Sequence, residues 1–236
     1  MGRITQSARL KKHGLPYKSS SEKVGINQLW ATTISEHKKK YMYDNARVLI
    51  LDAEEMQTTN HLLKAGFRAR DITAPNINPD VVQILRSHGV NSTFNTIGRY
   101  LRRAHPTIPY FWLDAMCTLN GNELGHRPCA DVDTYLRRDI GGDNCIIGVT
   151  ICNRSKNTRT NVAPQIEMMQ HQMEAIFGGN GYSYTNLYLD TYKRNMVFGL
   201  WELNRSADAV RKPLLRAKHS RQPIGFPVGY DVSHLQ

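Results

Sequence analysis

Two aspartates close short apolar runs of the sequence. Asp52 follows the run that begins at Ala46, and Asp114 follows the run that begins at Pro109. Continuous apolar runs of this length are typical of strands buried on both faces of a sheet, and a buried carboxylate is costly unless it is paired. The two aspartates are therefore the first candidates for chemistry, and the structural alternative is that each caps a following helix.

The other reactive side chains form no familiar metal or nucleophile motif. The four cysteines form no Cys-x-x-Cys pair, and the nine histidines form neither His-x-x-x-His nor His-Glu-x-x-His. These spacings disfavour a zinc ribbon, a thioredoxin-like site and a zinc protease, and we predict no metal site. We expect reduced, buried thiols. Cys117 lies in the loop after Asp114, but no adjacent base is evident that would make it a nucleophile.

The elements that position the two aspartates alternate along the chain. The expected strands cover 46–52, 71–76, 90–94, 109–114, 145–152, 184–192 and 196–203, and the expected helices cover 25–43, 58–66, 79–89, 97–103, 132–138 and 164–177. Strand–helix alternation requires parallel strands with helices on both faces, and the last two strands form a hairpin. The predicted fold class is α/β, with a doubly wound, mostly parallel seven-stranded sheet and a C-terminal antiparallel β-hairpin.

The net charge is concentrated at the two ends of the chain. Of the total of +11, residues 1–40 contribute +7, residues 205–236 contribute +4, and residues 41–204 balance to zero. We divide the chain into a basic flexible arm (1–25), an α/β domain (26–204) and a basic irregular C-terminal arm (205–236). A neutral body with basic arms indicates contact with a polyanion, most commonly nucleic acid. Arms that only keep the protein in solution are the alternative.

The sequence also bears on location. No apolar run reaches the roughly 18 residues of a membrane span, and the polar N-terminal region contains no apolar stretch of a secretory signal. We therefore predict an intracellular protein, in the cytoplasm or the nucleus, without a membrane partner. Association with a virion stays open.

Five strand–helix units followed by a β-hairpin resemble the class I S-adenosylmethionine-dependent methyltransferases, over roughly residues 44–204. The two strands that end in Asp52 and Asp114 add to this resemblance. It implies a Rossmann-like domain that binds S-adenosylmethionine at the carboxyl ends of its strands. The cofactor-binding residues that it implies are Asp52, Glu54, Thr58 and Thr59 after the first strand, Asn76 after the second and Asn95 after the third.

The chain departs from the family in the turn after the first strand. The segment LDAEEMQTT (residues 51–59) replaces the family's glycine-rich turn, in which glycines let the backbone approach the cofactor closely. Asn76 stands where the family usually has an acid that binds the ribose hydroxyls. Glu54 and Glu55 suit the sulfonium and ammonium groups of S-adenosylmethionine better than a pyrophosphate, or they serve as acids at a helix N-terminus.

For the reaction itself, the resemblance points to Asp114, which stands at the family's catalytic position. The adenine-N6 motif Asn/Asp/Ser-Pro-Pro-aromatic is missing after the fourth strand, and Pro128-Cys129 lies too far along to match the cytosine-C5 enzymes. The ribose 2′-O enzymes use a Lys-Asp-Lys-Glu tetrad, and Lys40, Asp114, Lys156 and Glu202 follow one another in that order. The candidate catalytic residues are thus Asp114, Lys156 and Glu202.

Three functions fit these observations. The first is an S-adenosylmethionine-dependent methyltransferase that acts on nucleic acid, with RNA favoured. The second is a catalytically inactive relative that binds nucleic acid or has a structural role, for example in a virion or a ribonucleoprotein. The third is a magnesium-dependent nuclease that uses Asp52, Glu54 and Asp114.

Overall fold

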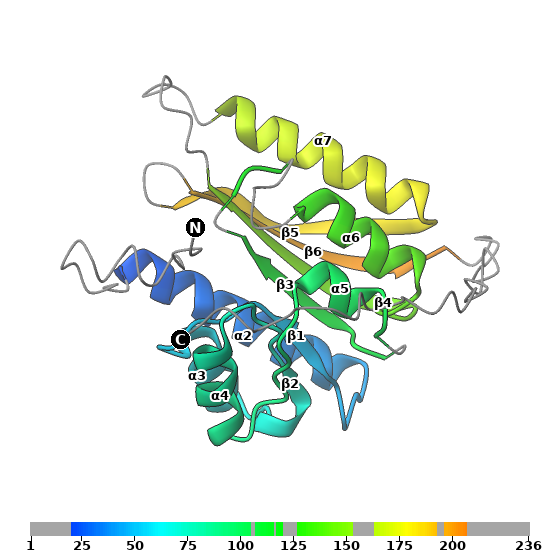
Figure 1. Cartoon of the computed structure of the whole chain (residues 1–236). Helices are drawn as coiled ribbons and strands as arrows, with labels where there is room; N and C mark the ends of the chain where they lie inside the picture. The colour runs from blue at the N-terminus through cyan, green and yellow to red at the C-terminus, as the bar shows by residue number, and fades with distance from the viewer. Residues whose placement is uncertain are drawn as a thin grey trace, which may run out of the picture.

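The core of the protein is a single six-stranded sheet. The computed structural model describes residues 20–104, 107–115, 117–119, 127–152, 163–192 and 196–206. Within these residues the strand order is β2-β1-β3-β4-β6-β5 (Figure 1). The strands are β1 (Val48–Ile50), β2 (Ile72–Thr73), β3 (Tyr110–Asp114), β4 (Asn144–Cys152), β5 (Tyr182–Tyr192) and β6 (Met196–Arg205). β2, β1, β3 and β4 are parallel, whereas β6 and β5 form the predicted antiparallel hairpin.

The prediction of seven strands is wrong by one. Residues 90–94 contact the edge of the sheet through two isolated parallel bridges, Thr73 with Asn91 and Asn76 with Phe94, and do not form a strand. Ala74 and Asn76 donate their backbone N–H groups to this segment. The intervening Pro75 would face β1, but proline has no N–H to donate. Pairing of β2 with β1 therefore ends at Thr73, and only a short, irregular edge remains.

Helices cover both faces of the sheet (Figure 1). One face carries α2 (Ser21–Lys40), α3 (Gln57–Lys64) and α4 (Pro79–Ser87), and the other carries α5 (Ile97–Leu101), α6 (Pro128–Arg137) and α7 (Ala163–Gly179), while a 3₁₀ turn, η1 (Ala69–Asp71), precedes β2. Side chains alternate between the two faces along each strand. Tyr110 and Trp112 pack in the core beneath α2, whereas Phe111 and Leu113 pack in the core beneath α6. The doubly wound arrangement is thus confirmed.

The longest described helix, α2, begins at Ser21, earlier than the predicted start at residue 25. The Ser20 side chain accepts a hydrogen bond from the backbone N–H of Lys23 and so caps the helix. One stripe of its side chains is buried against the sheet: Lys23, Ile26, Asn27, Trp30, Ala31, Ile34 and His37. Neither α2 nor any other helix in the described ranges is long and apolar enough to cross a membrane.

Candidate functional site

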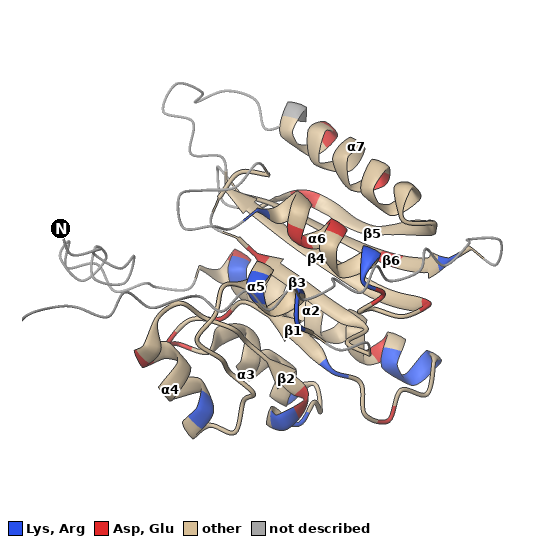
Figure 2. Cartoon of the chain, turned by 45° about the vertical axis from the view of Figure 1, so that its right-hand side comes forward, with Lys and Arg blue, Asp and Glu red and all other residues tan. Residues whose placement is uncertain are grey.

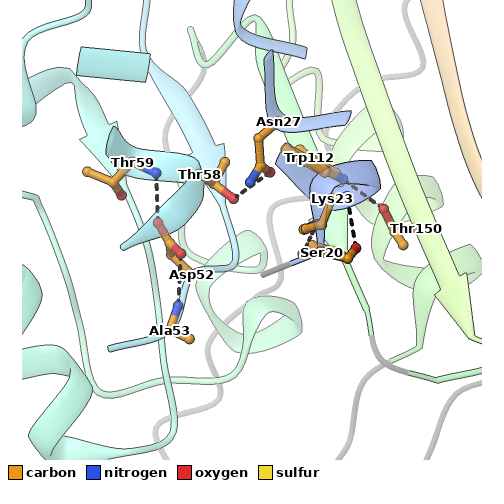
Figure 3. A network of polar contacts seen from close by, with 10 residues as sticks. Ser20, Lys23, Asn27, Asp52, Ala53, Thr58, Thr59, Trp112 and Thr150 are labelled. Carbon is orange, nitrogen blue, oxygen red and sulfur yellow. Dashed lines mark hydrogen bonds and ion pairs between the residues drawn. The ribbon is translucent and has the colours of Figure 1, made fainter. Parts of the chain in front are cut away.

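A buried ion pair joins the start of α2 to the end of β3. The Lys23 ammonium lies 2.5 Å from Oδ2 of Asp114, and the two side chains are only 6% and 18% exposed. The same ammonium lies 4.4 Å from the centre of the Trp112 ring, close enough for a cation–π interaction. The Trp112 indole in turn donates a hydrogen bond to the Thr150 hydroxyl on β4. Figure 3 shows Lys23 beside Trp112 at this end of the sheet.

Lys23 occupies a place that helix physics disfavours. It is the third residue of α2, and the N-terminus of a helix carries a partial positive charge that repels cations. Burying the ammonium adds a desolvation cost. Local sequence preference therefore does not explain Lys23, and only its tertiary partners, Asp114 and Trp112, do. Residues that break local rules in this way are most often found at functional sites.

Asp52 lies in the loop that joins β1 to α3. One carboxylate oxygen accepts a hydrogen bond from the backbone N–H of Ala53 at 2.9 Å, and the other accepts one from the backbone N–H of Thr59 at 2.8 Å (Figure 3). Burial raises the pKa of Asp52, the hydrogen bonds from Thr59 and Ala53 oppose this shift, and nearby Asp114 adds to it. The capping alternative therefore describes Asp52 well, although the charge of Asp114 also acts on it.

The turn after β1 is built without glycine. Met56, the residue before α3, has φ of +51° and ψ of +35° and is buried. This left-handed conformation costs a non-glycine residue about 1–2 kcal/mol. Of the predicted cofactor residues here, Thr58 is buried and its hydroxyl donates to Oδ1 of Asn27, Thr59 is buried, and Glu54 is partly exposed in the turn.

Asn76 links the loop after β2 to the loop after β1. Its side-chain amide donates to the backbone carbonyl of Asp52 at 2.9 Å, and its oxygen accepts the backbone N–H of Asn78 at 2.8 Å. Asn95 donates its backbone N–H to the carbonyl of Asn76. The neighbouring Phe94 and Ile77 are 64% and 40% exposed. The structure thus brings Asp52, Asn76 and Asn95 together at one edge, beside uncovered apolar surface.

The proposed Lys-Asp-Lys-Glu tetrad is not assembled. Glu202 on β6 lies opposite Ile146 of β4, whereas Asp114 lies opposite Thr150, so the two acids are four residues, or about 13 Å, apart along the strands. Lys40 bonds to Glu202 at 2.9 Å and is therefore at the wrong end of α2 to meet Asp114. Lys156 lies outside the described residues. The helix lysine that meets Asp114 is Lys23, which we had placed in the flexible arm.

The surroundings of the thiols and carboxylates disfavour a cysteine nucleophile and a metal-dependent nuclease. All four cysteines are free, and burial raises the pKa of Cys117 to about 11 and that of Cys145 to about 12, so these two are poor nucleophiles at neutral pH. Within the described ranges no three His, Cys, Asp or Glu side chains are grouped so that they could hold a metal ion. Asp52 is held by backbone N–H groups and Asp114 by Lys23, which disfavours the nuclease hypothesis.

Comparison with solved structures identifies the architecture. The chain superposes on cofactor-bound Rv0187 from MTB with a TM-score of 0.52 at 16% identity, covering 85% of this chain and 88% of that one. An O-methyltransferase from Bacillus cereus in complex with SAH gives 0.51 at 13% identity, with 83% and 86% covered. The plantazolicin methyltransferase BamL, in complex with an analogue and SAH, gives 0.52 at 10% identity, with 85% and 90% covered.

The chain has the class I methyltransferase fold. No protein-family model and no curated protein sequence matches it, so at these identities the likeness is one of fold alone. In a methyltransferase fold the edge formed by the ends of β1, β2 and β3 faces the ligand crevice. Lys23, Asp52, Asn76 and Asp114 all lie at that edge, which makes it the candidate site.

Sequence reasoning missed Lys23 for an identifiable reason. The predicted helix was taken to begin at residue 25, so Lys23 was assigned to the arm. Extending the buried stripe back by three residues from Ile26 leads to Lys23, and extending it forward by three from Ile34 leads to His37. The helical period therefore contained the signal, but a search for apolar residues excluded both positions.

Proposed function

We propose that the protein is an S-adenosylmethionine-dependent methyltransferase that acts on nucleic acid, with RNA as the favoured acceptor. The observation that carries this proposal is the buried Lys23–Asp114 ion pair at the carboxyl edge of the sheet. A buried ion pair is a poor way to gain stability, and one that opposes a helix dipole is worse. A functional role for the pair accounts for both costs.

The residues at the edge fit the cofactor. Asn76 and Asn95 and the exposed Phe94 ring would hold the adenosine, because an exposed aromatic face beside amides suits a nucleobase. Asp52 and Glu54 would supply negative charge to the cationic part. Oδ1 of Asp114 is buried and has no hydrogen-bond partner among the described residues, which leaves one acceptor of this carboxylate unsatisfied. When bound, the cofactor supplies an electrophilic methyl group.

Asp114 and Lys23 would act on the acceptor. In this proposal Asp114 aligns the acceptor and takes its proton through the unpaired oxygen Oδ1, while Lys23 holds the other oxygen. The choice of nucleic acid rests on charge. Figure 2 shows both basic and acidic residues on helices of both faces of the sheet, and the net charge of residues 41–204 is zero. The excess of +11 therefore belongs to residues 1–40 and 205–236, a distribution that favours a polyanionic partner.

A catalytically inactive relative is the second candidate, and specific contacts favour it. Both oxygens of Asp52 and both polar atoms of Asn76 are used within the protein. The turn after β1 has left-handed Met56 in place of a glycine-rich sequence. In this function the same fold binds nucleic acid without transferring a methyl group.

Calorimetric titration with S-adenosylmethionine and S-adenosylhomocysteine separates the two candidates. We expect micromolar binding by the natural chain, loss of at least tenfold in affinity in Asp52→Asn, and unchanged binding in Glu202→Gln, since Glu202 lies at the opposite edge. Transfer of a radioactive methyl group to RNA then tests the reaction. Absence of binding at millimolar cofactor, with folding verified by circular dichroism, would overturn the enzymatic proposal in favour of the inactive relative.

A further inference from the structure

A groove opens between α2 and α3, beside the candidate site. Its volume is about 190 Å³, and its lining consists of Val24, Asn27, Gln57, Asn60, His61 and Lys64. Val24 follows Lys23 in the chain, and Gln57 is the first residue of α3, so the groove begins at the carboxyl edge. Lys64, the last residue of α3, marks its far end.

Besides the apolar side chain of Val24, the groove is lined by amides, an imidazole and an ammonium, without an acid. Asn27 is completely buried, and its Oδ1 accepts the Thr58 hydroxyl at 3.3 Å (Figure 3). Its Nδ2 is buried without a hydrogen-bond partner in the part of the chain that the structure describes. A buried N–H group left unpaired is costly, and an acceptor bound in the groove that Asn27 lines would satisfy it.

Three further polar residues of the lining have the same preference. Lys64 contributes a cation, and burial and Lys64 together lower the pKa of His61, so that its ring is neutral at pH 7 and can donate through one nitrogen. Gln57 contributes a further amide at the start of α3, where the helix dipole is positive. Donors of this kind without an opposing carboxylate select an anion that carries several acceptor oxygens.

We infer that the groove between α2 and α3 binds a backbone phosphate of the nucleic-acid acceptor. The volume has room for roughly six water molecules, enough for a phosphodiester group. A strand whose reacting nucleotide lies at Asp114 would place a neighbouring phosphate there and so fix its register. This inference rests on the proposed function, because it takes the acceptor to be nucleic acid.

The first test compares single-charge changes at matched glutamines. Gln57→Glu places an acid in the groove at the first position of α3, where it also favours the helix dipole, so the fold is retained or stabilised. Gln83→Glu makes the same change on exposed α4. Fluorescence anisotropy with a short, labelled single-stranded RNA should show a loss of about tenfold in affinity for Gln57→Glu and little change for Gln83→Glu.

Charge reversal at lysine provides the second test. Lys64→Glu should weaken RNA binding and lower the slope of log K against log salt by about 0.7, the value for one lost contact to single-stranded nucleic acid. Lys39→Glu, at the exposed far end of α2, is the control. Equal losses in the groove and control variants would overturn the groove as a binding site. Failure of the natural chain to bind RNA would overturn it as well. Cofactor titration is independent of these results and would still report on methyl transfer.

Discussion

The two ends of α2 carry the same chemistry in opposite surroundings. At the N-terminal end, Lys23 and Asp114 form an ion pair with side chains 6% and 18% exposed. At the C-terminal end, Lys40 is 61% exposed and bonds to Glu202 at 2.9 Å, a carboxylate that also accepts the Tyr41 hydroxyl at 3.1 Å. Lys40 suits the negative end of the helix dipole, whereas Lys23 opposes the positive end.

This contrast separates a pair that the fold favours from one that it tolerates. The C-terminal pair follows local preference, and its lysine stays in water although the Glu202 side chain is only 16% exposed, so its presence needs no functional reason. The N-terminal pair opposes local preference and is removed from water, and it lies at the edge where this fold binds ligands. Finding both on one helix makes each a control for the other.

The largest expected effect is on stability after the buried pair is broken. Lys23→Met leaves Asp114 without its partner in a buried position, and we expect a loss of about 3 kcal/mol in the free energy of unfolding. Lys40→Met should change the stability far less, because the Lys40 side chain is 61% exposed and Glu202 keeps the hydroxyl of Tyr41 as a donor. Urea denaturation of both variants measures the difference. Equal losses would show that burial does not distinguish the two ends.

How much of this contrast the sequence could predict depends on the kind of signal. The apolar runs that end in Asp52 and Asp114 predicted β1 and β3 and their parallel order, because burial on both faces leaves a continuous pattern. The sequence could not predict which lysine reaches Asp114, because pairing across 91 residues depends on where α2 begins and how it lies on the sheet. Lys40 and Glu202 were singled out as members of a tetrad with Asp114, but the order of residues along the chain does not tell which edge of a sheet they reach.

His37, near the C-terminal end of α2, should dominate the change in stability at low pH. His37 is buried beside Tyr110 and Glu202, and its pKa is lowered to about 4, first by burial. The unfolded chain binds a proton at its usual value near 6.5, so stability is full above that pH and falls as the pH drops toward 4. The expected loss is about 3 kcal/mol.

His37→Phe removes this titration, and the difference in urea midpoint between the natural chain and the variant should shrink from pH 7 to pH 4. Asp131, whose pKa burial raises to about 6, acts with the opposite sign, because its neutral form is favoured in the fold. It is present in both proteins and cancels in the difference. A constant difference across this range would mean that folding does not shift the pKa of His37.

The smallest expected change in stability tests the contrast most sharply. In Lys23→Met/Asp114→Leu both charges are replaced by apolar side chains, so no unpaired charge stays buried, and such replacements are often neutral or stabilising. We therefore expect unfolding within about 1 kcal/mol of the natural chain, although Lys23→Met alone is strongly destabilised. Methyl transfer to RNA should nevertheless fail in the double variant, because the Asp114 carboxylate that takes the proton of the acceptor is gone. Full stability with lost transfer would assign the buried pair to function. Full stability with retained transfer would instead make the pair a dispensable feature of the fold, and the functional contrast between the two ends of α2 would disappear.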